Sequence, residues 1–310
     1  MKSLQFTFPL AAVLAGLFSV GAYAAENSYS SSVAQWRQEA GSRLVSEHGP
    51  LAAIGMFWLH PGENHIGSYP SNEVLLPADV APSQVGVVKL EGDELTLETT
   101  GAVPVALGGA VVTHAAWKTN AVGKLPEASI GRLKLELLDK EQGRSIRVYD
   151  PNSSALRDFP GQQWYAVDAK WLVPGHFTPF DAPKTLEYET ALGSTRSTQI
   201  LGVVSFERNG KQYQLEVQPS GKEGYVGFFF DTTTGKATYA GGRVVPIAKL
   251  DGDKVALDFN KAYNMPCAVS PYFACEIAPK QNHLSLAIPV GEKKPAVKVQ
   301  RVASAPSYLK

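Results

Sequence analysis

The sequence predicts a mainly β protein, with one helix near the N-terminus followed by two antiparallel β domains. Runs of four to eight residues rich in Val, Ile, Leu, Phe and Tyr recur along most of the chain, separated by Gly, Pro, Asn and Asp. Asn209 with Gly210, and Asp251 with Gly252, separate such runs as pairs that favour hairpin turns. The 28 Gly and 21 Pro residues suit a protein of strands and turns. Strand and helix patterns do not alternate strongly, so a parallel sheet is not expected.

The first 24 residues have the pattern of a secretory signal peptide. Lys2 supplies a positive start, residues 9–20 are mostly apolar, and residues 22–24 place Ala at the two positions that a signal peptidase reads. We therefore expect cleavage after Ala24 and a periplasmic or secreted protein. The apolar run is too short to span a membrane comfortably and no second run follows, so no membrane span is expected after cleavage.

A polar segment and an N-terminal helix are expected over residues 25–60. Residues 25–31 are polar, and we expect them to be disordered. The helix is predicted from Ser32, which has capping-box spacing to Gln35. Four apolar residues then recur at helical spacing: Val33, Trp36, Ala40 and Leu44. Residues 48–50, a His-Gly-Pro sequence, end this segment.

The predicted strands fall into two domains. They are residues 85–90, 94–98, 133–138, 145–149, 200–207, 212–217, 225–230 and 254–259. Residues 150–154 have the turn-rich sequence Asp-Pro-Asn-Ser-Ser, which marks the best boundary. We therefore expect a first β domain over residues 61–150 and a second over residues 151–310.

The charge balance disfavours some classes of partner. The chain has 29 basic and 29 acidic residues, so its formal net charge at pH 7 is zero. Proteins that bind nucleic acid neutralise phosphates with clustered Lys and Arg, and the composition predicts no such surface. No basic amphipathic helix suggests binding to a membrane surface. Small or neutral molecules are the expected partners.

Polar residues gather after the last predicted strand. Asp258 and Asn260 share one face by the two-residue period of a strand. Tyr263 and Asn264 follow in a turn that Pro266 stops. One interpretation is a pocket for a small polar ligand, with Asp258 as a candidate catalytic residue and the other three as binding residues. The alternative is a polar loop whose side chains satisfy its own backbone.

A second polar group surrounds residues 228–230, a predicted buried strand. Asp231 follows at the end of this strand, and Arg243 lies after the next turn. The two side chains are predicted either to form an ion pair that supports the hairpin or to act on a ligand. In the second case Arg243 binds an anionic ligand and Asp231 is the acid or base. If Asp231 and Asp258 converge, one of the two carboxyl groups would have a raised pKa and could transfer a proton.

The two cysteines predict a disulfide. Cys267 and Cys275 would enclose a short loop in an exported chain, adding about 2 kcal/mol to the free energy of unfolding. Together with His283 their spacing is wider than in structural zinc sites, so no metal is expected. No known motif of serine hydrolases, zinc proteases or nucleotide-binding folds occurs, and no cofactor is expected.

Several short motifs occur in a characteristic order. They are residues 55–59 (GMFWL), 62–68 (GENHIGS), 147–150 (RVYD), 228–239 (FFFDTTTGKATY), 242–243 (GR), 257–267 (LDFNKAYNMPC), Cys275 and 291–293 (GEK). This series resembles DUF1684, a bacterial and archaeal family of unknown function, over nearly all of the mature chain. The family often has two prolines before its first cysteine, where this chain has Met265 and Pro266. The resemblance implies no activity.

Residues 62–68 and 72–77 also resemble the opening of a forkhead-associated (FHA) β-sandwich. FHA domains read phosphothreonine with an Arg after an Ile-Gly pair and with a later Ser-x-x-His. This chain has Ser68 in place of that Arg, and Ser83 is not followed by the His. Without the guanidinium the bidentate phosphate contact is lost. The resemblance therefore implies an FHA-like sandwich without phosphopeptide binding.

Three classes of function remain open. The first is an exported protein with a small polar-ligand pocket in the second β domain. The second is a hydrolase that uses Asp231 or Asp258 as acid or base. The third is an envelope structural or interaction protein without a small-molecule site. The number of polar residues between 231 and 282 favours the first two classes, and the absence of a catalytic motif favours the first and third.

Overall fold

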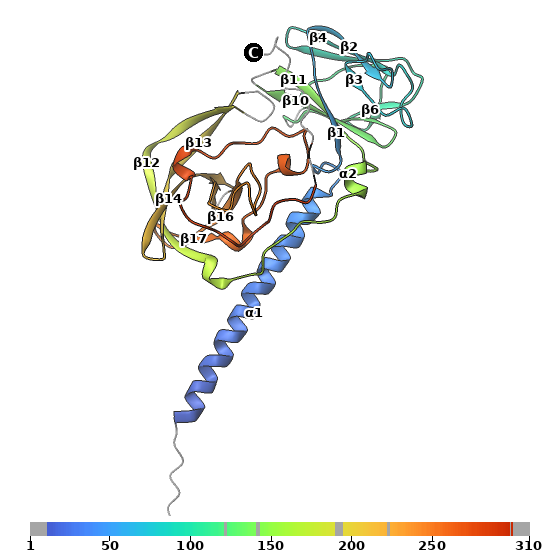
Figure 1. Cartoon of the computed structure of the whole chain (residues 1–310). Coiled ribbons are helices and arrows are strands. Elements are labelled where there is room, and N and C mark those ends of the chain that lie inside the picture. Colours follow the sequence, from blue (N-terminus) through green and yellow to red (C-terminus); the bar gives the residue numbers. More distant parts are fainter. Residues whose placement is uncertain are drawn as a thin grey trace, which may run out of the picture.

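The computed structural model describes residues 11–120, 123–140, 143–189, 195–221, 224–297 and 299. Within them the chain forms a long helix, two sheets packed as a sandwich, and a closed barrel (Figure 1). Among the described strands, neighbours pair antiparallel except for β2 with β3, which is parallel. The expectation of a mainly β fold with an N-terminal helix and antiparallel sheets is therefore confirmed.

Helix α1 (Ala11–Leu44) begins earlier than the sequence predicts. Residues 25–31, expected to be disordered, lie inside it, because the Tyr29 hydroxyl is hydrogen-bonded to the barrel. The predicted signal peptide lies in part outside the described residues, and the rest of it forms the start of α1. The N-terminal part of this helix projects away from both β domains, whereas its C-terminal part lies against the barrel (Figure 1). Among the helices of the described chain, none combines the length and the hydropathy that a membrane span requires.

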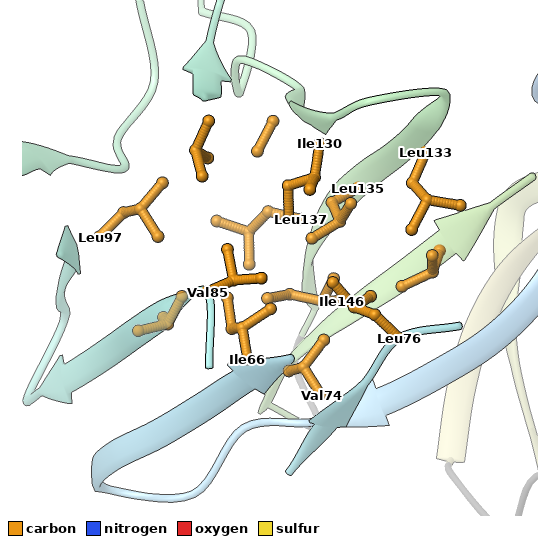
Figure 2. Packing of buried hydrophobic residues seen from close by; sticks show 14 of the residues in the cluster. Ile66, Val74, Leu76, Val85, Leu97, Ile130, Leu133, Leu135, Leu137 and Ile146 are labelled. Atoms are coloured by element: carbon orange, nitrogen blue, oxygen red, sulfur yellow. The ribbon is translucent and has the colours of Figure 1, made fainter. Parts of the chain in front are cut away.

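The first β domain is a sandwich of two sheets, with strand orders β1-β11-β10-β9-β6-β7 and β3-β2-β4-β5-β8. The strands are β1 (Ala53–Trp58), β2 (Gly62–Gly67), β3 (Val74–Leu75), β4 (Gly86–Glu91), β5 (Glu94–Thr99), β6 (Val105–Leu107), β7 (Ala110–Val111), β8 (His114–Ala116), β9 (Ala128–Ile130), β10 (Leu133–Lys140) and β11 (Gly143–Tyr149). Leu133, Leu135 and Leu137 are buried at every second position of β10, and they pack with side chains of the other sheet such as Ile66 and Leu97 (Figure 2).

The second β domain is a six-stranded closed barrel in which β17 pairs with β12. Its strands are β12 (Leu172–Glu189), β13 (Thr195–Arg208), β14 (Lys211–Ser220), β15 (Gly224–Phe229), β16 (Arg243–Lys249) and β17 (Lys254–Asp258). The two predicted hairpin turns are present: Asn209 and Gly210, both with positive φ, join β13 to β14, and Asp251 and Gly252 lie between β16 and β17.

The C-terminal segment (residues 259–293) crosses the barrel after β17 in short turns: η2 (Phe259–Lys261), η3 (Pro266–Ala268) and η4 (Lys280–Asn282). Its apolar residues Phe259 and Ile288, both 0% exposed, belong to the same core as Leu257 on the barrel wall. A small barrel has room for little besides such side chains. The barrel interior is therefore a packed core.

Candidate functional site

The residues predicted to bind or react lie where the barrel meets α1 and the C-terminal segment. Asp258 ends β17, and its carboxylate accepts a hydrogen bond from the Tyr29 hydroxyl at 2.7 Å and pairs with the Lys261 ammonium at 3.1 Å. Burial, and after it the hydrogen bond to Asp258, raises the pKa of Tyr29, which keeps this hydroxyl a donor. Asp258 therefore fastens α1 to the barrel.

Asn260 is fully buried and uses both ends of its amide. Its Nδ2 donates to the Asp168 carbonyl at 2.8 Å and to the Tyr29 hydroxyl at 3.0 Å, and its Oδ1 accepts from the Asp168 N–H at 2.9 Å. The Arg37 guanidinium donates to the carbonyls of Asn260 and Tyr165 at 3.0 and 2.9 Å. These bonds join three parts of the chain: α1, the segment around Asp168 that precedes the strand β12, and the C-terminal segment. They leave Asn260 with little capacity for a ligand.

Tyr263 and Asn264 also bind to other parts of the chain. The backbone of Tyr263 pairs with Val244, and its ring centroid lies 5.7 Å from that of Trp36 on α1. The N–H of Asn264 donates to the Glu292 carboxylate at 2.7 Å, and its Nδ2 donates to the Lys293 carbonyl at 2.8 Å. Both residues thus hold the C-terminal segment in place.

Asp231 and Arg243 form a buried ion pair, with an N–O distance of 3.5 Å and side-chain exposures of 0% and 1%. The guanidinium donates to the carbonyls of Ile288 and Val290, and Asp231 accepts from the Ile288 N–H at 2.8 Å. The Thr233 hydroxyl donates to Asp231 as well. Burial lowers the pKa of Arg243, and the adjacent Asp231 opposes this effect. The pair therefore holds residues 288–290 against β16.

We call these six predicted residues the clasp: Asp231, Arg243, Asp258, Asn260, Tyr263 and Asn264. In the described part of the chain, Asp231 and Asp258 share no hydrogen-bonding or ion-pairing partner. None of the six lines either of the two cavities described below. Their contacts match the interpretation in which polar side chains satisfy the chain's own backbone, so the clasp joins α1 and the C-terminal segment to the barrel.

The predicted disulfide between Cys267 and Cys275 is absent from the structure. The two residues are nevertheless neighbours, because the N–H of Cys267 donates to the Cys275 sulfur at 3.1 Å. A hydrogen bond with the Cys267 thiol, together with burial, raises the pKa of Cys275. The two side chains therefore lie together as predicted, but no covalent bond joins them. Within the described residues, no three His, Cys, Asp or Glu side chains are grouped to hold a metal ion.

The larger cavity, with a volume of about 670 Å³, lies between the two β domains. Its sandwich side is formed by residues around Leu51 and Ile54, and α2 (Ser154–Arg157) forms a second side. The remaining side includes residues 269–272 of the C-terminal segment, which we call the wall segment. We call this space the interdomain cavity. Its described lining combines apolar residues with hydroxyl-bearing ones, and Asp158 is the one charged residue in it.

Ser270, in the wall segment, is the feature of this cavity that points to a ligand. The residue is 2% exposed, and its hydroxyl has no hydrogen-bond partner among the residues that the structure describes. A buried hydroxyl without a partner costs about 1–3 kcal/mol. By contrast, the nearby Ser153 hydroxyl donates to the Leu51 carbonyl and accepts from the Leu156 N–H. Burial raises the pKa of Tyr272, which keeps this second polar side chain of the lining neutral.

A smaller cavity of about 320 Å³ lies in the sandwich beside Trp117 and Leu95. The indole N–H of Trp117 already donates to the Pro126 carbonyl at 2.8 Å. This polar group is therefore satisfied without a ligand, and the interdomain cavity is the stronger candidate site.

Comparison with known proteins places the barrel and the C-terminal segment in a family. Residues 157–293 match the family described as protein of unknown function (DUF1684). The chain belongs to DUF1684. A relative of known structure, solved by solution NMR, is an uncharacterized protein of Haloarcula marismortui. It is 31% identical over 46% of this chain and 82% of that chain, with a TM-score of 0.39. The DUF1684 match includes all six clasp residues and the wall segment.

Two further comparisons add little about the activity of this DUF1684 protein. The structural neighbours of the chain include an FHA domain, from a study of phosphothreonine-dependent FHA interactions. That match has 15% identity, covers 29% of this chain and 79% of that chain, and has a TM-score of 0.22, which supports no inference about function. The comparison with curated proteins found no match.

The sequence did not indicate the interdomain cavity. Ser270 and Tyr272 lie inside the motif-rich stretch, but neither belongs to a motif that marks a site. The cavity forms where residues 50–54, residues 153–158, the wall segment, Val297 and Val299 meet in space. A Ser-Pro pair between two cysteines was the available signal, and it is equally typical of a turn.

Proposed function

We propose that this DUF1684 protein is an exported binding protein that holds a small, uncharged molecule in the interdomain cavity. The observation that carries the proposal is the buried Ser270 hydroxyl, which lines this cavity and has no hydrogen-bond partner in the described part of the chain. A ligand carbonyl, hydroxyl or N–H would satisfy this hydroxyl and recover its desolvation cost.

The cavity's size and lining define the ligand class. A volume of about 670 Å³ is in the range of sites for drug-sized molecules. Apolar residues such as Leu51, Ile54 and Val269 would bury most of such a ligand. The described lining contains no basic side chain, and Asp158 would repel a carboxylate or phosphate. Neutral molecules that combine an apolar body with at least one hydrogen-bonding group fit best.

Binding without catalysis agrees better with the polar groups of the chain. A serine nucleophile needs a base within hydrogen-bonding distance, and Ser270 has no hydrogen-bond partner among the described residues. The hydrolase alternative requires Asp231 or Asp258 as acid or base, yet both carboxylates are bonded to groups of the chain itself. An envelope protein without any small-molecule site is the alternative that a failed binding experiment would favour.

Export remains part of the proposal. It is supported by the signal-peptide pattern of the first 24 residues. Cleavage after Ala24 would leave Tyr29 and Arg37 in the mature protein, so the bonds of the clasp to α1 would be preserved. The mass and N-terminal sequence of protein recovered from the periplasm or medium test this step. A mature chain that keeps residues 1–24 would contradict it.

Binding is tested with N-phenyl-1-naphthylamine, a neutral fluorophore with one N–H donor. We expect saturable binding to the full mature chain and an about fivefold weaker affinity for Ser270→Ala, the equivalent of one hydrogen bond. The same variant should unfold at an equal or higher temperature, because it removes an unsatisfied hydroxyl. Ser205→Ala, on the outer part of the barrel, is the matched control and should bind as the wild type does.

A second variant tests the location by filling the cavity. Ala155→Trp places a large ring at an exposed lining position of α2, where the fold tolerates it, and we expect probe binding to be lost. Wild-type affinity in both Ala155→Trp and Ser270→Ala would show that the probe binds elsewhere and would overturn the proposed site.

A further inference from the structure

The two cysteines bracket the wall segment of the interdomain cavity. Cys267 precedes residues 269–272 and Cys275 follows them. The segment leaves the first cysteine in a tight turn, in which the N–H groups of Val269 and Ser270 donate to the Pro266 carbonyl at 3.1 and 3.0 Å. Any bond between the cysteines would therefore fix both ends of the cavity wall.

The two cysteines already lie together inside a small core. The N–H of Cys267 donates to the Cys275 sulfur at 3.1 Å, and the two side chains pack with Val244 and Met265. Cys275 is 7% exposed, whereas Cys267 is partly exposed. An outside reagent therefore reaches the Cys267 sulfur more easily than the Cys275 sulfur.

The wall segment is also the contact through which the C-terminal segment meets the sandwich. Nε of Arg147, on β11, donates to the Tyr272 carbonyl at 3.2 Å, and its guanidinium carbon lies 4.1 Å from the Phe273 ring centroid. Tyr272 and Phe273 pack against Ala52 and Tyr149 of the first domain. A bond that joins the ends of the wall segment therefore affects both the contact between the two domains and the wall of the interdomain cavity.

We propose that Cys267 and Cys275 form a reversible disulfide that tightens ligand binding in the interdomain cavity. This inference rests on the proposed function, because the regulated site is the same cavity. Joining the ends of the wall segment restricts its motion in the unliganded protein, so less conformational entropy is lost when a ligand binds. The oxidised form therefore holds the ligand more tightly than the dithiol form.

The oxidant is a disulfide, either a small molecule or a protein. The Cys267 thiolate attacks it, forms a mixed disulfide and releases one thiol of the oxidant. The Cys275 thiolate then attacks the Cys267 sulfur, closes the Cys267–Cys275 bond and releases the second thiol. Two electrons pass to the oxidant disulfide, and the two protons of the cysteines end on its two thiols. Cys275 suits the second step because it is more buried than Cys267, and its sulfur already lies beside Cys267.

The experiment compares the full mature chain after treatment with oxidised glutathione and after reduction by a phosphine. Intact mass should show loss of two hydrogens on oxidation, and N-phenyl-1-naphthylamine should bind the oxidised form about fivefold or more tightly. The Cys267→Ser and Cys275→Ser double variant should bind the probe equally under both treatments. The wild-type comparison needs no variant, so a folding defect of the double variant would not affect it.

The outcomes separate this inference from the proposed function. If the disulfide forms and the probe affinity is the same in both forms, or if no disulfide forms, the redox inference is overturned while cavity binding stands. If the probe affinity responds to oxidation but not to Ser270→Ala and Ala155→Trp, the bound site is elsewhere and both proposals fail.

Discussion

Glu292 is a buried carboxyl group whose role is set by its neighbours. It is 3% exposed, and its Oε2 accepts the N–H of Asn264 at 2.7 Å. Burial raises its pKa to about 7, although the hydrogen bonds and Arg243 act in the opposite direction. The residue belongs to the GEK motif at residues 291–293, and in this structure its carboxyl group binds the backbone of the clasp residue Asn264.

The raised pKa of Glu292 predicts that stability depends on pH. The folded chain binds this proton more tightly than the unfolded chain, whose carboxyl has an ordinary value of 4.5. The contribution to the free energy of unfolding is therefore fully present below about pH 4.5, and about 3 kcal/mol is lost as the pH rises through 7. Glu292→Gln should remove this slope while keeping an acceptor for the Asn264 N–H.

Urea unfolding at several pH values between 5 and 8 measures the effect. Glu47→Gln, at an exposed position after α1, is the matched control and should keep the wild-type slope. An unchanged slope in Glu292→Gln would show that Glu292 titrates as an ordinary carboxyl group.

Helix α1 is held on the barrel by a few specific contacts. Tyr29, Trp36 and Arg37 reach the end of β17 and the C-terminal segment, and the Arg37 guanidinium lies 4.8 Å from the Trp164 ring. Val33 is completely buried as well. The helical spacing of Val33 and Trp36 predicted the packed face, but the polar contact of Tyr29 extended the ordered helix beyond it.

Tyr29→Phe should weaken the docking of α1. The change removes a donor to the Asp258 carboxylate and leaves that charge partly unsatisfied, which should lower the free energy of unfolding by about 1–3 kcal/mol. Urea unfolding of the mature chain measures this loss. Tyr69→Phe, at an exposed position on the sandwich, is the control and should change little. Equal stability in the two variants would mean that the Tyr29 hydroxyl contributes nothing net.

At the scale of the whole molecule, the two β domains meet at a contact that includes Arg147. This side chain is 8% exposed and joins Glu136 on the sandwich to Tyr272 and Phe273 of the C-terminal segment. The same contact forms part of the cavity wall. We therefore expect a substitution that weakens this contact to weaken ligand binding as well.

Arg147→Lys should loosen the junction while keeping a positive charge near Glu136. Lysine lacks the planar group that both donates through Nε and covers the Phe273 ring. We expect calorimetry to resolve separate unfolding of the two domains and probe affinity to fall several-fold. Arg157→Lys on α2 is the matched control. A single unchanged transition together with wild-type affinity would contradict this role.

The sequence by itself determined the strands and turns that local chemistry specifies. All eight predicted strands overlap observed ones, because alternation such as Leu133, Leu135 and Leu137 needs only a two-residue period. The Asn209–Gly210 turn was predictable for a similar reason, since both residues tolerate positive φ. The short strands β6 to β9 carry too few residues for such a pattern and were not predicted, and neither were the longer strands β1, β2, β12 and β16.

The roles of polar side chains depended on partners far away in the chain. Asp258 binds Tyr29 across 229 positions, and Asn260 binds Asp168 across 92, so local sequence could mark these residues as unusual but could not say what they contact. Ser270 is the opposite case, because its hydroxyl is buried without a partner only once both domains close around it. Burial and hydrogen bonding are properties of the assembled chain, and they moved the candidate site from the clasp to the interdomain cavity.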